Sequence, residues 1–410
     1  MKSVRSLTVS AALLIVPSLF AALLASVALA QEPIQSSQKP EWSFDLQNSP
    51  AYAARMERVR KAFSPHLPRP QLAFLSADTL AVSFADGSWQ DYQPETPRGF
   101  FHFRAFFIDT AKSTLTGPTL SWPTPDDDSI LLPLSDGGFV TLACKHLVRY
   151  SSDFSVVRQA SVPADPGNEG PEFANYGSTA VYQIEYWRAQ EDPKGQVVVL
   201  SHYGPAGTSY FWISPESLSV AGMAKDRDAP SVAGTKDVHA GAILPASRAI
   251  AAGPWTFPTI AYDDGAWQTF CPLVEAFSMA IFANEDKFFA EYSSHQGVRY
   301  ALVDNRCRIL LDLPGIYSNG ELGAVSRAGN RIAIGERSPL YTSVFSRAIR
   351  VKLILRIWDL DRPREIERLT LSQRKSGIVV TGMDDFAIAL SPDGKTLAVL
   401  IDATLMLYSI

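Results

Sequence analysis

Short runs of hydrophobic residues, separated by tight turns, fill the C-terminal end of the sequence. Residues 386–390 (Phe-Ala-Ile-Ala-Leu) predict a strand, and residues 396–401 and 404–410 predict two more. Between the first two runs, residues 391–395 (Ser-Pro-Asp-Gly-Lys) predict a turn, because proline presets φ and glycine supplies a positive φ. The pattern is that of antiparallel strands joined by short turns.

Weaker copies of this unit recur along the chain. Their turns lie near positions 78, 136, 195, 286, 329 and 393, so the gaps are 58, 59, 91, 43 and 64 residues. Since the gap of 91 residues is the longest and spans about two units, a degenerate copy is expected around residues 237–267. The chain therefore contains about seven units, each close to the length of a four-stranded propeller blade.

Two stretches carry a resemblance to a known superfamily. Residues 390–398 (Leu-Ser-Pro-Asp-Gly-Lys-Thr-Leu-Ala) and 356–360 (Arg-Ile-Trp-Asp-Leu) resemble the WD-repeat and YVTN-like propellers. The resemblance is good over 320–410, fair over 70–145 and 275–313, and poor over 205–270, and the Gly-His dipeptide of true WD repeats is missing. It implies an all-β fold, a single propeller of about seven four-stranded blades, and no particular ligand.

The ring of blades needs a closing strand, because the last unit contains only three. Residues 41–46 (Glu-Trp-Ser-Phe-Asp-Leu) alternate in polarity and are predicted to pair with residues 404–410. Ser49 and Pro50 then predict the start of a short helix over residues 50–63. Its stripe of Tyr52, Met56, Val59 and Phe63 is expected to pack on the propeller, with Arg55, Arg58 and Lys61 on a solvated face. A helix that binds a membrane surface or a partner is the alternative.

Residues 1–30 are typical of a signal peptide. Lys2 and Arg5 precede an apolar stretch over 7–27, and residues 28–30 (Ala-Leu-Ala) form a small-x-small cleavage pattern, so Gln31 is expected to begin the mature chain. The sequence thus predicts a secreted or periplasmic protein without membrane insertion after signal cleavage. Residues 31–70 would form an N-terminal segment and 71–410 the propeller. A retained membrane anchor is the alternative.

Charge and cysteine content narrow the class further. The chain has 37 basic and 42 acidic residues, and loss of residues 1–30 removes two basic ones, which leaves a net charge of −7. Such a chain, without a basic cluster, is not expected to bind nucleic acid. Cys144, Cys271 and Cys307 do not form a disulfide framework; Cys271–Cys307 is the favoured pair, and three free thiols are the alternative. The protein is expected to be monomeric.

Standard catalytic motifs do not occur in the sequence. It lacks a Gly-x-Ser-x-Gly elbow, a Walker loop, a His-Glu-x-x-His pair and a dinucleotide fingerprint, so no catalytic residue is assigned. Asp126, Asp127 and Asp128 do not fit an EF-hand, because Leu131 stands where that loop requires glycine. The histidines show no metal-ligand spacing, so no metal ligand is assigned either.

The order of strands predicts which loops share a face. In a propeller, loops that lead from a fourth strand to the next first strand lie on the same side as second-to-third loops. On that side the sequence predicts an acidic rim with aromatic and histidine side chains, which could concentrate cations or a basic partner. The candidate binding residues are Trp89, Tyr92, Asp126, Asp127, Asp128, Glu169, His202, His295, Glu321, Asp384 and Asp385.

Two functions are compatible with these features. The favoured hypothesis is a non-catalytic secreted or periplasmic binding module whose acidic rim binds a protein, peptide or cell-wall component, with no cofactor. The alternative is a metal-dependent propeller hydrolase of the lactonase kind, with a divalent cation such as Ca²⁺ in the central funnel. The sequence leaves the question of enzymatic activity open and favours its absence.

Overall fold

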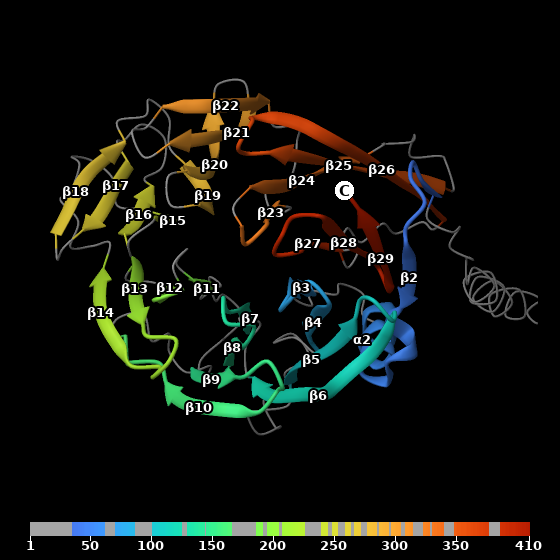
Figure 1. Ribbon diagram of the computed structural model, residues 1–410, viewed down its shortest axis with the longest axis horizontal. Helices are drawn as coiled ribbons and strands as arrows, with labels where there is room; N and C mark the ends of the chain where they lie inside the picture. Colours follow the sequence, from blue (N-terminus) through green and yellow to red (C-terminus); the bar gives the residue numbers. More distant parts are fainter. Residues whose placement is uncertain are drawn as a thin grey trace, which may run out of the picture.

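The computed structural model describes most of the chain beyond residue 34. The described residues are 35–61, 70–86, 101–124, 129–143, 145–165, 186–191, 195–204, 207–225, 239–244, 248–252, 259–263, 266–271, 277–284, 287–294, 297–304, 308–314, 323–328, 330–339, 348–376 and 386–410. Their strands form seven sheets arranged in a ring around a central axis (Figure 1). The protein is a seven-bladed β-propeller, as its turn spacing predicts.

Each blade is an antiparallel sheet whose strands follow one another from the axis outward. Blade 1 contains β3 (Gln71–Phe74), β4 (Thr79–Ala85), β5 (Phe101–Asp109) and β6 (Thr114–Thr124). Blade 2 contains β7 (Ile130–Pro133), β8 (Phe139–Ala143), β9 (His146–Tyr150) and β10 (Val156–Ser161). Blade 3 contains β11 (Tyr186–Glu191), β12 (Val198–Gly204), β13 (Gly207–Ile213) and β14 (Val220–Lys225).

The remaining four blades repeat the arrangement. Blade 4 contains β15 (His239–Leu244), β16 (Arg248–Ala252), β17 (Thr259–Asp263) and β18 (Ala266–Cys271), where the degenerate copy is predicted. Blade 5 contains β19 (Phe277–Asn284), β20 (Lys287–Ser294), β21 (Gly297–Asp304) and β22 (Ile309–Pro314). Blade 6 contains β23 (Gly323–Val325), β24 (Arg331–Pro339), β25 (Ala348–Asp359) and β26 (Arg364–Ser376). Blade 7 contains β27 (Phe386–Leu390), β28 (Thr396–Ile401) and β29 (Thr404–Ser409).

The core lies between the faces of neighbouring blades. One apolar cluster joins blades 1 and 7, including Val82 and Leu400, and another joins blades 6 and 7 through Leu355 and Val399. Both faces of an inner strand therefore meet a neighbouring sheet, which explains why Thr396–Ile401 is a nearly continuous apolar run. Among the described residues, blades 1, 2, 6 and 7 each contribute to two such layers, so the stability of one of these blades depends on those beside it.

The turn of the last unit locks blade 7 to blade 6. Gly394 adopts φ +72°, and a Cβ placed there would lie 2.4 Å from Cγ of Arg331 in blade 6. The backbone N–H of Ala328, also in blade 6, donates to the carbonyl of Pro392 at 2.9 Å. Glycine is required here both by its positive φ and by the close approach of the next blade.

The ring closes through a strand from the other end of the chain, which confirms the sequence prediction. The strand β2 (Trp42–Asp45) pairs antiparallel with β29, with Trp42 opposite Leu407 and Asp45 opposite Thr404. Its Trp42 indole N–H donates to the carbonyl of Thr110 in blade 1 at 2.8 Å. One short segment thus completes blade 7 and contacts the blade on its other side.

A two-residue strand precedes the closing strand and was not predicted. The strand β1 (Gln35–Ser36) adds to the outer edge of β26, with Ser36 opposite Leu371. The pairing continues beyond it, because Ser37 N–H donates to the carbonyl of Thr370 at 2.9 Å. Blade 6 therefore has five strands, and the N-terminal segment spans the outer edges of blades 6 and 7 (Figure 1).

A short 3₁₀ turn, η1 (Leu46–Asn48), leads into the helix α2 (Pro50–Lys61), which agrees with the predicted start. Tyr52 is fully buried, and its hydroxyl donates to the carbonyl of Asp402 in blade 7 at 2.8 Å. Met56 packs against the apolar cluster between blades 1 and 7, to which Tyr52 belongs. The side chain of Val59, and Phe63 altogether, lie outside the described residues.

The prediction that Arg55 lies on a solvated face is wrong. Its side chain is 0% exposed, donates to the carbonyl of Ala85 at 2.7 Å and lies over the ring of Phe84. The helix contacts the propeller with more than its apolar stripe, because the end of β4 offers a carbonyl and an aromatic face to the guanidinium. The side chains of Arg58 and Lys61 lie outside the described residues.

Candidate functional site

Among the candidate rim residues, His202 is the one that the structure describes. It lies near the end of β12, where a second strand leads toward a third. Its side chain is 1% exposed, so it is buried beneath the loop face rather than exposed on a rim. His202 is buried because it stands opposite Trp187 in the neighbouring inner strand β11. The two rings stack with centroids 4.0 Å apart.

His202 belongs to a buried cluster of charged side chains. Its Nδ1 lies 3.1 Å from Oδ2 of Asp165, and the other carboxylate oxygen of Asp165 accepts a hydrogen bond from Nζ of Lys225 at 2.7 Å. Asp165 is 3% exposed. The three residues come from different places: the connection after β10, the end of β12 and the end of β14. The cluster therefore ties blade 2 to blade 3 on the face that carries fourth-to-first and second-to-third connections.

The buried cluster of Asp165, His202 and Lys225 holds blade 2 against blade 3. A buried carboxylate needs a partner, and Lys225 supplies the opposite charge in a geometry that recovers part of the desolvation cost. His202 adds a second hydrogen bond and is held flat by Trp187. Asp165 and Lys225 were not singled out from the sequence, because no linear spacing links a loop residue to the ends of two strands in the next blade.

The other candidate rim residues lie outside the described residues. The described strands on either side assign them to second-to-third connections (Trp89, Tyr92 and His295) and to fourth-to-first connections (Asp126, Asp127, Asp128, Glu169, Glu321, Asp384 and Asp385). Cys271 ends β18, but its side chain and the residues Cys144 and Cys307 also lie outside the described part. Among the described residues, no group of three or more His, Cys, Asp or Glu side chains is placed to hold a metal ion.

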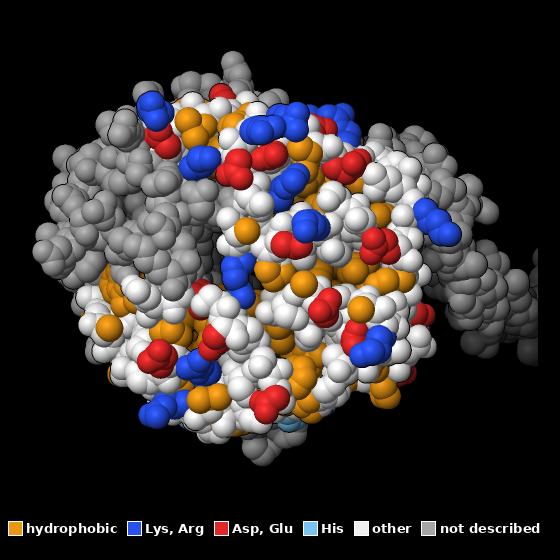
Figure 2. Space-filling model, in the orientation of Figure 1, with side chains coloured by type: hydrophobic (Ala, Val, Ile, Leu, Met, Phe, Trp, Pro, Cys, Tyr) orange, Lys and Arg blue, Asp and Glu red, His pale blue; other side chains and the backbone are white. Residues whose placement is uncertain are grey.

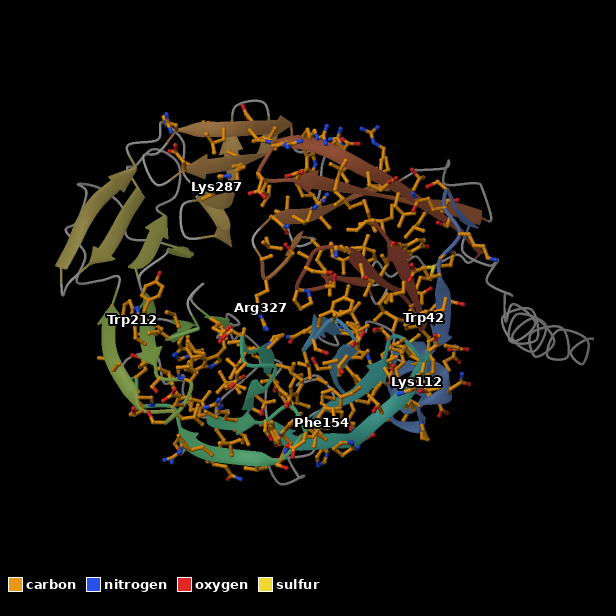
Figure 3. The ribbon with its side chains drawn as sticks, in the orientation of Figure 1. Trp42, Lys112, Phe154, Trp212, Lys287 and Arg327 are labelled. Carbon is orange, nitrogen blue, oxygen red and sulfur yellow. The ribbon has the colours of Figure 1, made fainter. Side chains whose placement is uncertain are left out.

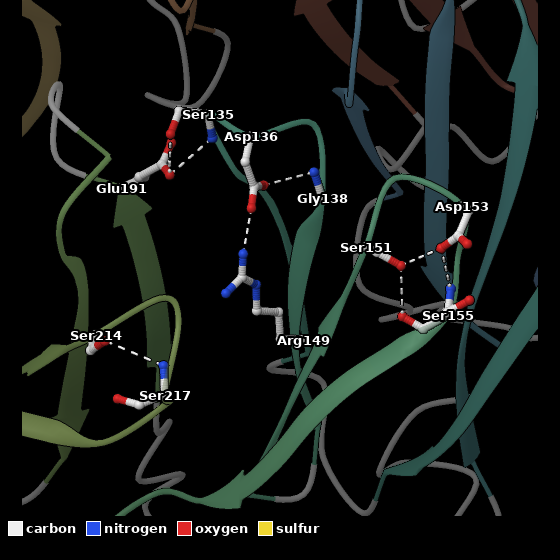
Figure 4. A network of polar contacts seen from close by, with 10 residues as sticks. All are labelled: Ser135, Asp136, Gly138, Arg149, Ser151, Asp153, Ser155, Glu191, Ser214 and Ser217. Atoms are coloured by element: carbon white, nitrogen blue, oxygen red, sulfur yellow. Dashed lines mark hydrogen bonds and ion pairs between the residues drawn. The ribbon is translucent and has the colours of Figure 1, made fainter.

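A second polar cluster lies on the opposite face, where the turns between first and second strands gather (Figure 4). Glu191, the last residue of β11, accepts hydrogen bonds from the backbone N–H and the hydroxyl of Ser135 in blade 2, at 2.9 and 3.0 Å. Asp136 beside it pairs with Arg149 and accepts from the N–H of Gly138. The cluster joins the turn of blade 2 to the first strand of blade 3, so these two blades are tied on both faces.

Arg327 approaches this cluster from the other side of the ring. It lies in the turn between β23 and β24, and Figure 3 shows it near the middle of the ring. Its side chain reaches solvent, yet the surrounding protein lowers the pKa of its guanidinium, against the effect of the carboxylates of Glu191 and Asp136. Burial raises the pKa of Glu191, against the effect of the two hydrogen bonds from Ser135 and the charge of Arg327. The charge of each group therefore affects the pKa of the other.

Substituting Glu191→Gln is expected to raise the thermal midpoint at about pH 8 and not at about pH 4. Because the folded-state pKa of Glu191 is raised, the ionised form costs stability, and this cost develops as pH rises through the window from the ordinary carboxyl pKa upward. The amide oxygen of glutamine can still accept both bonds from Ser135. Thermal scans of the two proteins at both pH values test the prediction, and an equal difference at both values would contradict it.

The face that Figure 2 shows presents no patch of one sign over the described residues. Acidic and basic side chains are interspersed, with apolar ones between them, over the described residues on the face that Figure 2 shows. Within the described part of the chain, none of the helices is long and apolar enough to cross a membrane.

Comparisons with known proteins return similar folds and no family. No family model matches the chain, and no curated protein matches it. Among solved structures, the Dos1 propeller is 10% identical, with 90% of this chain and 95% of that chain covered and a TM-score of 0.45. The WD40 domain of Pan2 from Neurospora crassa is 9% identical, with 91% and 96% covered and a TM-score of 0.43. The WD40 domain of SCAP from fission yeast is 9% identical, with 90% and 98% covered and a TM-score of 0.40. Likeness at this level says nothing of ligand or activity, so the assignment as a propeller rests on the seven sheets of the chain itself.

Proposed function

We propose that this propeller is a non-catalytic binding module that works in a secreted or periplasmic setting after removal of residues 1–30. Its loop face, formed by the fourth-to-first and second-to-third connections, binds a basic protein or peptide. The observation that carries the proposal is the buried cluster of Asp165, His202 and Lys225, because it fixes connections of two blades against one another. A rigid framework beneath variable loops is typical of a binding platform.

The charge of the chain supports a basic partner. Seven of the candidate rim residues are acidic, and all seven belong to fourth-to-first connections. Carboxylates gathered around one opening attract cationic groups and raise the association rate of a basic partner. The cluster of Asp165 lies in the interior and is no part of the proposed contact surface.

Neutralising the rim is expected to weaken binding of a basic probe. The variant Asp126→Asn/Asp127→Asn/Asp128→Asn is compared with the wild type for affinity toward a fluorescent decalysine peptide, by fluorescence polarisation at low and physiological salt. Each exposed ion pair contributes about 0.2–1 kcal/mol, so loss of three is expected to weaken binding about tenfold. The effect should shrink as salt rises, because exposed charges are screened.

The matched control removes three acids from the opposite face. Asp78, Glu216 and Asp361 are exposed residues in turns between first and second or third and fourth strands. The variant Asp78→Asn/Glu216→Gln/Asp361→Asn has the same net charge as the rim variant and should bind the probe as the wild type does. Equal weakening in both variants would show that net charge alone governs binding and would refute the loop face as the site. Thermal midpoints with Ca²⁺ and with chelator complete the test, since a rise of several degrees with Ca²⁺ would favour the metal-dependent hydrolase instead.

A further inference from the structure

The exposed apolar side chains of the propeller gather on its outer strands. Among the side chains that the structure describes, the large apolar residues with the greatest exposure are Leu115 on β6, Val156 and Val157 on β10, Val220 and Met223 on β14, and Ile309 and Leu310 on β22. Each of these strands is the last in its sheet, so no other strand in the described part of the chain pairs with its outer edge. An outer edge of this kind can pair with an added strand unless something blocks it.

Most of the outer edges carry such a block. The strand β6 contains Pro118 and Pro123, which cannot donate to a new strand. The strand β10 carries the exposed Arg158, a charged side chain of the kind that disfavours pairing at an edge. The strand β22 contains Asp312 and ends at Pro314. The edge of β26 is already covered by β1.

The outer edge of blade 3 lacks proline and exposed charge, although its register shifts once, at Ala221. Residues 220–224 of β14 (Val-Ala-Gly-Met-Ala) contain no charged residue and no proline. Val220 is 39% exposed and Met223 is 45% exposed, and the charged end of the strand, Lys225, is turned inward to Asp165. The strand β18 also lacks charge and proline, but its side chains lie outside the described residues.

The chain itself shows how such an edge accepts a strand. On blade 6, Gln35 and Ser36 pair with β26, and the main chain of Ser37 continues the pairing to Thr370. The added segment Gln-Ser-Ser-Gln is polar. Besides its main-chain pairing, the Ser37 hydroxyl accepts from the N–H of Thr370 at 2.9 Å, and the Gln38 amide donates to Glu367 at 2.8 Å. Strand addition at an outer edge is therefore compatible with the geometry of these blades.

We propose that the outer edge of β14, over residues 220–224, binds an extended segment of a partner protein by strand addition, and that the segment alternates apolar residues between basic ends. A second copy of this chain fits less well, because a six-residue edge with two exposed apolar side chains falls far below the roughly 800 Å² per partner of a stable dimer. The basic ends follow from charge complementarity: the edge is uncharged, the exposed Glu216 lies in the turn just before it, and the whole chain has a net charge of −5.

This surface is independent of the loop face. It lies on the side of the ring, and its main interaction is between backbones, whereas the loop face is proposed to act through carboxylates. At physiological salt, where attraction between exposed charges is screened, the rim variant Asp126→Asn/Asp127→Asn/Asp128→Asn should therefore bind the segment as the wild type does. Failure of either proposal leaves the other standing.

The test uses the mature chain and a fluorescein-labelled octapeptide, Lys-Val-Thr-Val-Thr-Val-Thr-Lys, in fluorescence polarisation. Saturable binding is expected, and Met223→Lys should weaken it at least about tenfold, which corresponds to about 1.4 kcal/mol, because a lysine on an open edge repels a basic strand and disfavours pairing. The matched control is Val157→Lys on β10, an edge already blocked, which should leave binding unchanged. Both replaced side chains are about half exposed, so both variants should keep the thermal midpoint of the wild type.

A second peptide separates strand addition from adhesion to an apolar patch. Two versions, N-methylated at odd or at even positions, each block the amide donors of one edge of the peptide. Pairing requires one edge, so at least one version should lose binding while the unmodified peptide binds. Absence of binding by the unmodified peptide, equal binding by all three peptides, or equal loss in Met223→Lys and Val157→Lys would each overturn the proposal. Self-association that disappears only in Met223→Lys would also overturn it, in favour of a second copy.

Discussion

Replacing Asp165 with alanine is expected to lower the free energy of unfolding by about 3–5 kcal/mol, the cost typical of breaking a buried ion pair by removal of one partner. The carboxylate of Asp165 is 3% exposed and lies 2.7 Å from Nζ of Lys225, whose burial depends on that counter-charge. The hydrogen bond to His202 is lost with it. Denaturant unfolding followed by tryptophan fluorescence measures the change, and a loss below about 1 kcal/mol would contradict the anchoring role.

An exposed ion pair provides the matched control. Nζ of Lys112 lies 2.6 Å from Oδ2 of Asp109 where β5 leads into a turn, and the lysine side chain is 76% exposed. The variant Asp109→Ala should lower the free energy of unfolding far less than Asp165→Ala does, because water solvates the lysine that remains. A further variant, Asp165→Leu/Lys225→Met, removes both buried charges and should be more stable than Asp165→Ala alone. If the double variant is the least stable of the set, packing rather than charge explains the effect.

Deleting residues 31–46 from the mature chain is expected to abolish cooperative folding of the ring. The deletion removes β2, with its four paired positions opposite β29, and also Leu46, which is fully buried in the cluster between blades 1 and 7. Burial of each large apolar side chain contributes about 1.5–3 kcal/mol, so loss of Trp42, Phe44 and Leu46 approaches the total stability of about 5–15 kcal/mol of a domain. Calorimetry should show a broadened transition, or none.

Two further experiments serve as controls for this deletion. A chain that begins at Lys39 loses β1 and keeps β2, and it should retain a cooperative transition with a modestly lower midpoint. A synthetic peptide of residues 35–46, added to the deleted chain, should restore part of the transition in a concentration-dependent way. An unchanged midpoint after the full deletion would show that the ring is stable without its closing strand.

Much of the fold is predictable from local chemistry. Turns such as residues 391–395 mark the units, because the proline and glycine there set backbone angles that a strand does not adopt. Blade 4 is found by the length of the gap that it fills, even though its own turn signals are weak. The closing strand at Trp42–Asp45 is predictable because an incomplete last unit requires one and its alternation marks it.

The failures have equally local causes. The strand β1 has only polar residues, Gln35 and Ser36, so hydrophobic alternation cannot reveal it. Arg55 was assigned to solvent because a helical pattern sorts residues by polarity alone. Such a pattern cannot show that the carbonyl of Ala85 in blade 1 accepts a hydrogen bond from the guanidinium. Fourth-to-first and second-to-third connections do share a face where Asp165 meets His202 at the end of a second strand. Depth is not predictable in this way, because position along a strand does not separate a buried side chain from an exposed one.

The composite seventh blade also sets the order in which the protein can fold. Trp42 pairs with Leu407, so this contact joins residues near the two ends of the polypeptide and must close a loop that contains every other blade. During synthesis the hairpins of the first six blades can form before β29 has been made. Until then β2 has no partner strand, its edge is open, and the apolar side chains of Trp42 and Phe44 are uncovered. Ring closure is thus a late, slow step with high contact order, and the interval before it is when the chain is most exposed to aggregation and most dependent on chaperones.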